Sequence, residues 1–66
     1  MNWRPMVTTD GKTWAGNALV FATKEEAEES AWELMMRWMA VRDTRADEVD
    51  LPVNYRFVDG KNERIV

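Results

Sequence analysis

The segment TKEEAEESAWELMMRWMAVR, residues 23–42, decides the fold because it carries the clearest helix signals in the chain. Thr23 and Glu26 form a capping box, in which the Thr23 hydroxyl accepts the Glu26 N–H and the Glu26 side chain reaches back to the Thr23 N–H. Glutamates fill the first turns and arginines lie toward the other end, as the helix dipole favours. These signals predict one helix over residues 24–42.

The predicted helix has more apolar surface than packing on a sheet requires. At about 100° per residue, a conventional core stripe contains Ala27, Ala31, Leu34, Met35, Trp38 and Val41. A second stripe contains Trp32, Met36 and Met39, so the apolar arc spans about 220° where roughly 100° would suffice. Either the sheet or the C-terminal hairpin covers Trp32, or the second stripe is exposed and contacts a partner.

Two Asp-Gly pairs predict β-hairpins, because both central positions of a type I′ turn require positive φ. The first pair, Asp10-Gly11, would join strands at about residues 6–9 and 12–15, with Val7 facing Trp14. Pro5 lacks an N–H, so this first strand is expected at a sheet edge or beginning after residue 5.

The second pair, Asp59-Gly60, would join strands at about residues 53–58 and 61–65, with Arg56 opposite Glu63. Residues 18–22 are a further short strand or a continuation of the second strand past a bulge, and residues 45–49 are a weaker strand. The ββ-α-ββ order predicts a single domain, residues 1–66, of the α+β class, in which one amphipathic helix packs across one face of a small antiparallel sheet.

Composition excludes several classes of site and partner. The chain has no cysteine and no histidine, which removes disulfides and the commonest metal ligands, and we expect no cofactor. The net charge of −3 is concentrated in the middle third, opposite to the basic stripe of a nucleic-acid binder. No apolar run reaches the length of a membrane span, and no signal peptide is visible, so a cytoplasmic location is expected.

Candidates for catalysis are weak. Ser30 lies on the polar side of the helix without a histidine to activate it, which predicts a solvated serine. The acidic cluster Asp47, Glu48 and Asp50 lacks the spacing and glycine of a calcium loop, so it is better interpreted as a solvated strand edge. We therefore expect no enzymatic activity.

Three motifs carry a resemblance. The run WAGNALVFATKEEA (residues 14–27), with RWMAVRD (37–43) and PVNY (52–55), resembles a group of short uncharacterised proteins of bacteria, phages and mobile elements. The resemblance covers roughly residues 14–55. It implies no activity, but it implies a context in which small proteins bind host proteins, including defence systems such as the CRISPR machinery.

The expected function is therefore stoichiometric binding of a protein partner, such as a host protein, or of a second copy in a homodimer. The apolar anchor would be Trp32, Met36 and Met39, and the acidic rim would include Glu25 and Glu29. The alternative is a nucleic-acid-binding module that stacks bases on Trp14, Tyr55 and Phe57.

Overall fold

The computed structural model describes residues 1–65, and Val66, the last residue of the predicted domain, lies outside the described residues. The elements, in order, are β1 (Asn2–Thr8), β2 (Ala15–Gly16), α1 (Lys24–Arg37), β3 (Asp43–Val49), β4 (Tyr55–Val58) and β5 (Lys61–Arg64).

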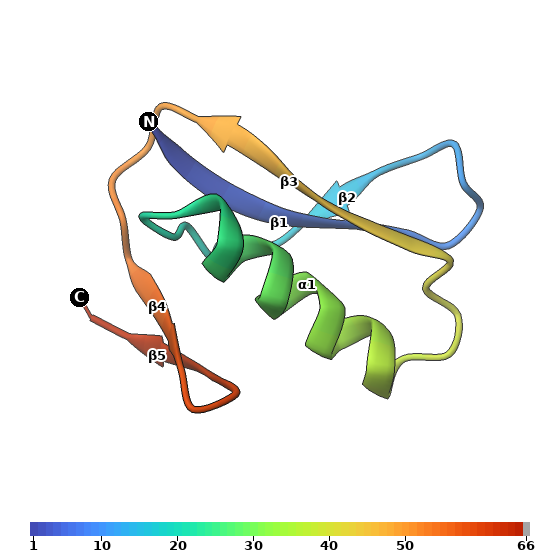
Figure 1. Ribbon diagram of the computed structural model, residues 1–66. Coiled ribbons are helices and arrows are strands. Elements are labelled where there is room, and N and C mark those ends of the chain that lie inside the picture. The colour runs from blue at the N-terminus through green and yellow to red at the C-terminus, as the bar shows by residue number, and fades with distance from the viewer. Residues whose placement is uncertain (66) are drawn as a thin grey trace.

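The strands form two antiparallel sheets, ordered β2-β1-β3 and β4-β5, and α1 lies across one face of the first (Figure 1). The predicted α+β class, with one helix packed on a sheet, is confirmed. The strands expected in one sheet are divided between two.

The core lies between α1 and the centre of the three-stranded sheet. Val7 of β1 packs with Ala31 of α1 and with Val41, and Leu34 and Met35 pack against this cluster. Small alanines on the inner face of α1 let the helix approach the sheet closely. The predicted core stripe is confirmed at Ala27, Ala31 and Val41, which are buried.

Pro5 lies in the central strand, not at an edge, and β1 begins before it. Trp3 donates to the Phe21 carbonyl at 2.8 Å and accepts the Phe21 N–H at 2.7 Å, which fixes the side to which alternate residues direct their N–H groups. Any other residue at position 5 would direct its N–H to this same side. In residues 1–65, this position lies between the Phe21 bridge and β2, where β1 has no paired strand. Proline is tolerated there because it removes no ladder hydrogen bond.

The first hairpin has a longer loop than predicted, and Val7 faces Ala15 instead of Trp14. Gly11 has positive φ, but the Asp10 carboxylate organises the loop by accepting the N–H groups of Lys12 and Thr13, each at 2.7 Å. These two hydrogen bonds, first that from Thr13, lower the pKa of Asp10 from 3.8 to about 2. The side-chain turn therefore replaces the two-residue turn expected from Asp-Gly.

Substituting Asp10→Asn should reduce the acid sensitivity of the fold. A folded-state pKa below the unfolded value stabilises the fold fully above about pH 4 and loses this effect as the pH falls toward 2. Asparagine retains an acceptor oxygen but does not titrate. Urea unfolding between about pH 5 and pH 2 should show a shallower loss of unfolding free energy for Asp10→Asn than for the wild type. Equal slopes would contradict this role for Asp10.

Residues 18–22 do not form the predicted strand, because Asn54 occupies their backbone groups. The Asn54 side chain accepts the Val20 N–H at 2.8 Å and donates to the Ala18 carbonyl at 2.7 Å. The Asn54 and Tyr55 N–H groups both donate to the Val20 carbonyl, at 3.1 and 3.2 Å. Only Phe21 of this segment pairs with β1, as an isolated bridge to Trp3.

Substituting Asn54→Ala should destabilise the fold by about 2–4 kcal/mol, because the buried Val20 N–H loses its acceptor and the Ala18 carbonyl loses its donor. The matched control is Asn17→Ala, which removes one exposed hydrogen bond, to the Leu19 N–H, and should cost no more than about 1 kcal/mol. Urea unfolding measures both. An equal loss of unfolding free energy in the two variants would show that the Asn54 hydrogen bonds stabilise the fold no more than the exposed Asn17 bond does.

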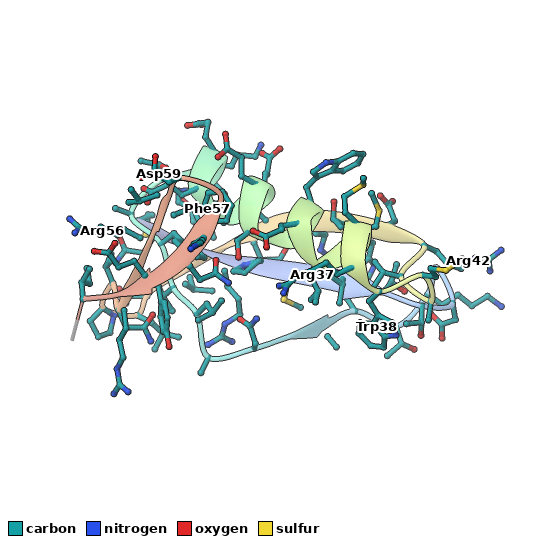
Figure 2. The ribbon with its side chains drawn as sticks, turned by 90° about the horizontal axis from the view of Figure 1, so that it is seen from below. Arg37, Trp38, Arg42, Arg56, Phe57 and Asp59 are labelled. Carbon is teal, nitrogen blue, oxygen red and sulfur yellow. The ribbon has the colours of Figure 1, made fainter. Side chains whose placement is uncertain are left out.

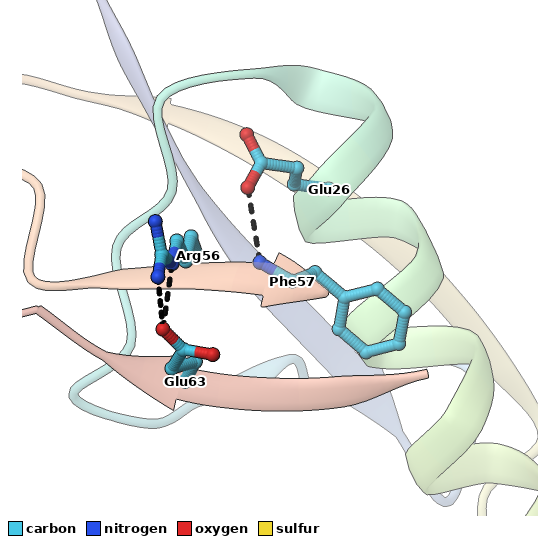
Figure 3. Close-up of polar contacts among 4 residues, drawn as sticks. All are labelled: Glu26, Arg56, Phe57 and Glu63. Atoms are coloured by element: carbon cyan, nitrogen blue, oxygen red, sulfur yellow. Dashed lines mark hydrogen bonds and ion pairs between the residues drawn. The ribbon is translucent and has the colours of Figure 1, made fainter. Parts of the chain in front are cut away.

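The second hairpin matches its predicted turn and register. Asp59 and Gly60 have φ of 53° and 75°, as a type I′ turn requires, and Arg56 pairs with Glu63. The Arg56 guanidinium donates from Nε to the Glu63 carboxylate at 2.8 Å (Figure 3). The first strand begins at Tyr55 instead of residue 53, since Asn54 is bonded to Val20.

One of the two hydrogen bonds predicted for the capping box forms, and the Glu26 side chain makes different contacts from those predicted. Thr23 is the N-cap, and its hydroxyl oxygen accepts the Glu26 N–H at 3.2 Å. The Glu26 carboxylate, however, accepts the Thr23 hydroxyl at 2.9 Å. Its second oxygen accepts the Phe57 N–H at 3.0 Å (Figure 3). Glu26 thus joins the start of α1 to the second hairpin.

The helix ends at Arg37, well before the predicted residue 42. Trp38 is the C-cap, with an extended backbone, and its N–H makes the last helical bond, to Leu34. The chain then turns back so that Val41 enters the core and the Arg42 N–H donates to the Thr8 carbonyl at 2.7 Å. Early termination also lets β3 begin at Asp43, two residues before the predicted strand.

Candidate functional site

The β4–β5 hairpin covers one flank of α1 and leaves the flank of Trp32 open. Ser30 is buried and its hydroxyl donates to the Asn62 side-chain oxygen at 2.7 Å, while Glu26 accepts the Phe57 N–H. Trp32 lies two residues beyond Ser30, which places it about 200° away around the helix. The hairpin therefore packs on the flank that was predicted to be solvated, and the prediction of a solvated Ser30 is wrong.

The open flank exposes two large apolar side chains on one helical ridge. Trp32 is 56% exposed and Met36 is 67% exposed, and their i, i+4 spacing makes them neighbours on the helix surface. Together with Met39, these residues are named the apolar strip below. The interpretation of Trp32 as a covered core residue is wrong in this structure.

Met39 belongs to the strip by exposure but not by helix geometry. It lies in the turn after α1 and is 97% exposed, because the helix ends at Arg37. Trp38, predicted to fill the core, is also displaced by this ending and remains 48% exposed. The end of α1 is therefore bordered by three large apolar side chains, two of them outside the helix.

Acidic residues continue the same ridge toward the start of α1. Glu25 and Glu29 precede Trp32 by seven and three residues, and both are exposed. Over residues 1–65 neither makes a side-chain hydrogen bond or ion pair, whereas Glu28 pairs with Lys24 at 3.9 Å and Glu33 pairs with Arg37 at 3.5 Å. The unneutralised charge beside the strip is negative, so it complements a basic surface.

A pocket of about 230 Å³ lies on the other flank of α1. It is lined from β1, β2, α1 and β5, with contributions from Asn17, Arg37, Trp38 and Asn62. This pocket was not predicted from the sequence, because its walls come from segments separated along the chain and no local motif marks any of them.

The other predicted candidates are dispersed or bonded within the chain. Trp14 precedes β2 and stacks on Arg45, with 4.3 Å from the guanidinium carbon to the ring centre, whereas Tyr55 and Phe57 lie in the second sheet. The three aromatics therefore do not share the predicted stacking platform. Asp47 of edge strand β3 pairs with Arg45 at 2.8 Å, and no cluster of three or more metal-binding side chains occurs among residues 1–65.

In the described part of the chain, no helix has the length and apolar character needed to cross a membrane.

Comparisons with protein-family models, with curated proteins and with solved structures give no match.

Proposed function

We propose that this protein is a non-enzymatic interaction module that binds a partner protein through the apolar strip. The observation that carries the proposal is the exposure of Trp32 beside Met36 on a helix whose opposite flank is covered, along its first half, by the chain's own hairpin. Tryptophan and methionine are enriched in the buried centres of interfaces, and tryptophan is over-represented among hot spots. Trp32 is thus the anchor, with Met36 beside it on the helix and the exposed Met39 in the turn that follows.

The acidic rim specifies the chemistry of the partner. Glu25 and Glu29 are exposed without an ion pair in residues 1–65, so a partner with an apolar pocket bordered by lysine or arginine would match both parts of the surface. Such a rim increases the association rate and the specificity more than the affinity. The proposed partner is therefore a basic protein surface with an apolar recess.

The resemblance of residues 14–55 to short proteins of bacteria, phages and mobile elements favours a host protein as this partner. The finer form of the proposal is a phage or mobile-element protein that binds or inhibits a host defence component, such as one of the CRISPR machinery. Within this proposal the protein acts in the cytoplasm and by occupancy of the host surface.

Substituting Trp32→Ala should abolish capture of the partner while changing the unfolding free energy by less than about 1 kcal/mol, since the side chain is half exposed. The matched control is Trp38→Ala, which removes a similarly exposed tryptophan from the other flank of the helix end. Immobilised wild type, Trp32→Ala and Trp38→Ala are compared for proteins captured from a host lysate, and urea unfolding checks each fold. The expected result is a protein retained by wild type and Trp38→Ala but lost with Trp32→Ala.

Two outcomes would contradict the proposal. If Trp32→Ala unfolded the chain, with the loss of about 3–5 kcal/mol typical of a core tryptophan, Trp32 would be a structural residue. If captured material were nucleic acid whose binding weakened steeply with salt, the contact would be with phosphate and the alternative module would be favoured. Light scattering at two concentrations identifies the third case, a homodimer that Trp32→Ala dissociates.

A further inference from the structure

The pocket on the other flank of α1 results from how the helix and hairpin are placed. The helix packs over β1 and β3, and the hairpin packs beside its first half, so the helix-facing side of the two-residue strand β2 is left uncovered. Figure 2 shows Arg37 and Trp38 at the end of α1, with the hairpin residues Arg56, Phe57 and Asp59 toward the other end. The pocket lies along this stretch, bounded by Asn62 and Trp38.

The walls combine an apolar floor with hydrogen-bond donors. Val7, Ala31, Leu34 and Trp38 supply apolar surface. The polar lining residues include Arg37 and two asparagines, Asn17 and Asn62.

Both amide oxygens are engaged, by the Leu19 N–H at 3.0 Å and the Ser30 hydroxyl at 2.7 Å, which leaves the amide N–H groups of Asn17 and Asn62 as donors. No aspartate or glutamate among residues 1–65 lines the pocket. The lining therefore favours a ligand that carries acceptors and negative charge.

Arg37 keeps capacity for such a ligand. Its only ion pair in the described chain joins Nε to Glu33 at 3.5 Å, and its side chain is 67% exposed, so the pair is weak and other guanidinium donors are available. Guanidinium and carboxylate groups form charge-assisted hydrogen bonds that are stronger than neutral ones.

The volume limits the apolar part of the ligand to a compact group. A dry cavity of about 150 Å³ holds benzene, so a pocket of about 230 Å³ accommodates one ring with a short substituent. We propose that the pocket binds a small organic carboxylate with a compact apolar body, the ring over Leu34 and Trp38 and the carboxylate at Arg37. This site lies on the flank opposite Trp32 and Met36 and does not depend on the proposed protein partner.

The test is a titration of the isotope-labelled protein with phenylacetate, followed by NMR of the backbone amides and the Trp38 indole. The expected result is saturable shifts at pocket residues with a Kd of ~1 mM, as for a ligand of about ten non-hydrogen atoms. Benzylamine, which carries the opposite charge on a similar body, should not bind. Equal affinity for the two probes would overturn the assignment of a carboxylate.

Variants separate the pocket from non-specific attraction. Arg37→Gln should weaken phenylacetate binding about fivefold or more through loss of the charge-assisted bond. Arg42→Gln, which makes the same charge change at an exposed arginine outside the pocket, should leave the Kd unchanged (Figure 2). Ala15→Leu places a larger side chain into the pocket from the exposed strand β2 and should abolish the shifts. Equal effects of Arg37→Gln and Arg42→Gln, or unchanged binding by Ala15→Leu, would overturn the proposal.

Discussion

Asn54 makes the set of hydrogen bonds on which the arrangement of this small chain depends. Its side chain satisfies the Val20 N–H and the Ala18 carbonyl, its own N–H donates to the Val20 carbonyl, and its carbonyl accepts the Ile65 N–H at 3.0 Å. Over residues 1–65 the two sheets share no paired strands, so this residue joins the segment before the helix to the C-terminal hairpin. A chain of this size buries little apolar surface, so packing alone does not fix the position of the hairpin, and directional hydrogen bonds of this kind must do so.

The position of the hairpin determines which flank of the helix is available for contact. Asn54 fixes the base of the hairpin. Glu26 then accepts the Phe57 N–H, and the Ser30 hydroxyl donates to Asn62, so the hairpin is held against the polar flank of α1. Among the described residues, nothing covers the apolar strip, which stays exposed. The exposure of Trp32 is thus a consequence of polar contacts made on the other side of α1.

Features determined by neighbouring residues were predictable from the sequence. Thr23 capped the helix as its spacing indicated, and Asp59-Gly60 set the register that pairs Arg56 with Glu63. Features determined by distant partners were not. The helix ends where Trp38 becomes extended, and the chain then returns so that the Arg42 N–H donates to the Thr8 carbonyl; no glycine or proline marks this end. The residues of the strip were identifiable from helical periodicity, but their exposure depended on where the hairpin packs, and the pocket had no local signal.

The two open surfaces of α1 differ in the contacts they can make, and the difference comes from the charges beside them. The strip has an exposed tryptophan beside glutamates that have no ion pair among residues 1–65, and this protruding shape and negative charge fit a recess on a basic protein. The pocket is concave, has no acidic lining residue within 1–65, and has an arginine at its wall, which fits a small acceptor-bearing molecule. Because Met36 and Arg37 are consecutive, the last turn of one helix contributes to both surfaces. The helix end at Arg37 therefore shapes both surfaces. A helix continued to residue 42 would place Trp38 and Met39 on helical faces. Instead they follow the helix, where Trp38 borders the pocket and Met39 extends the strip.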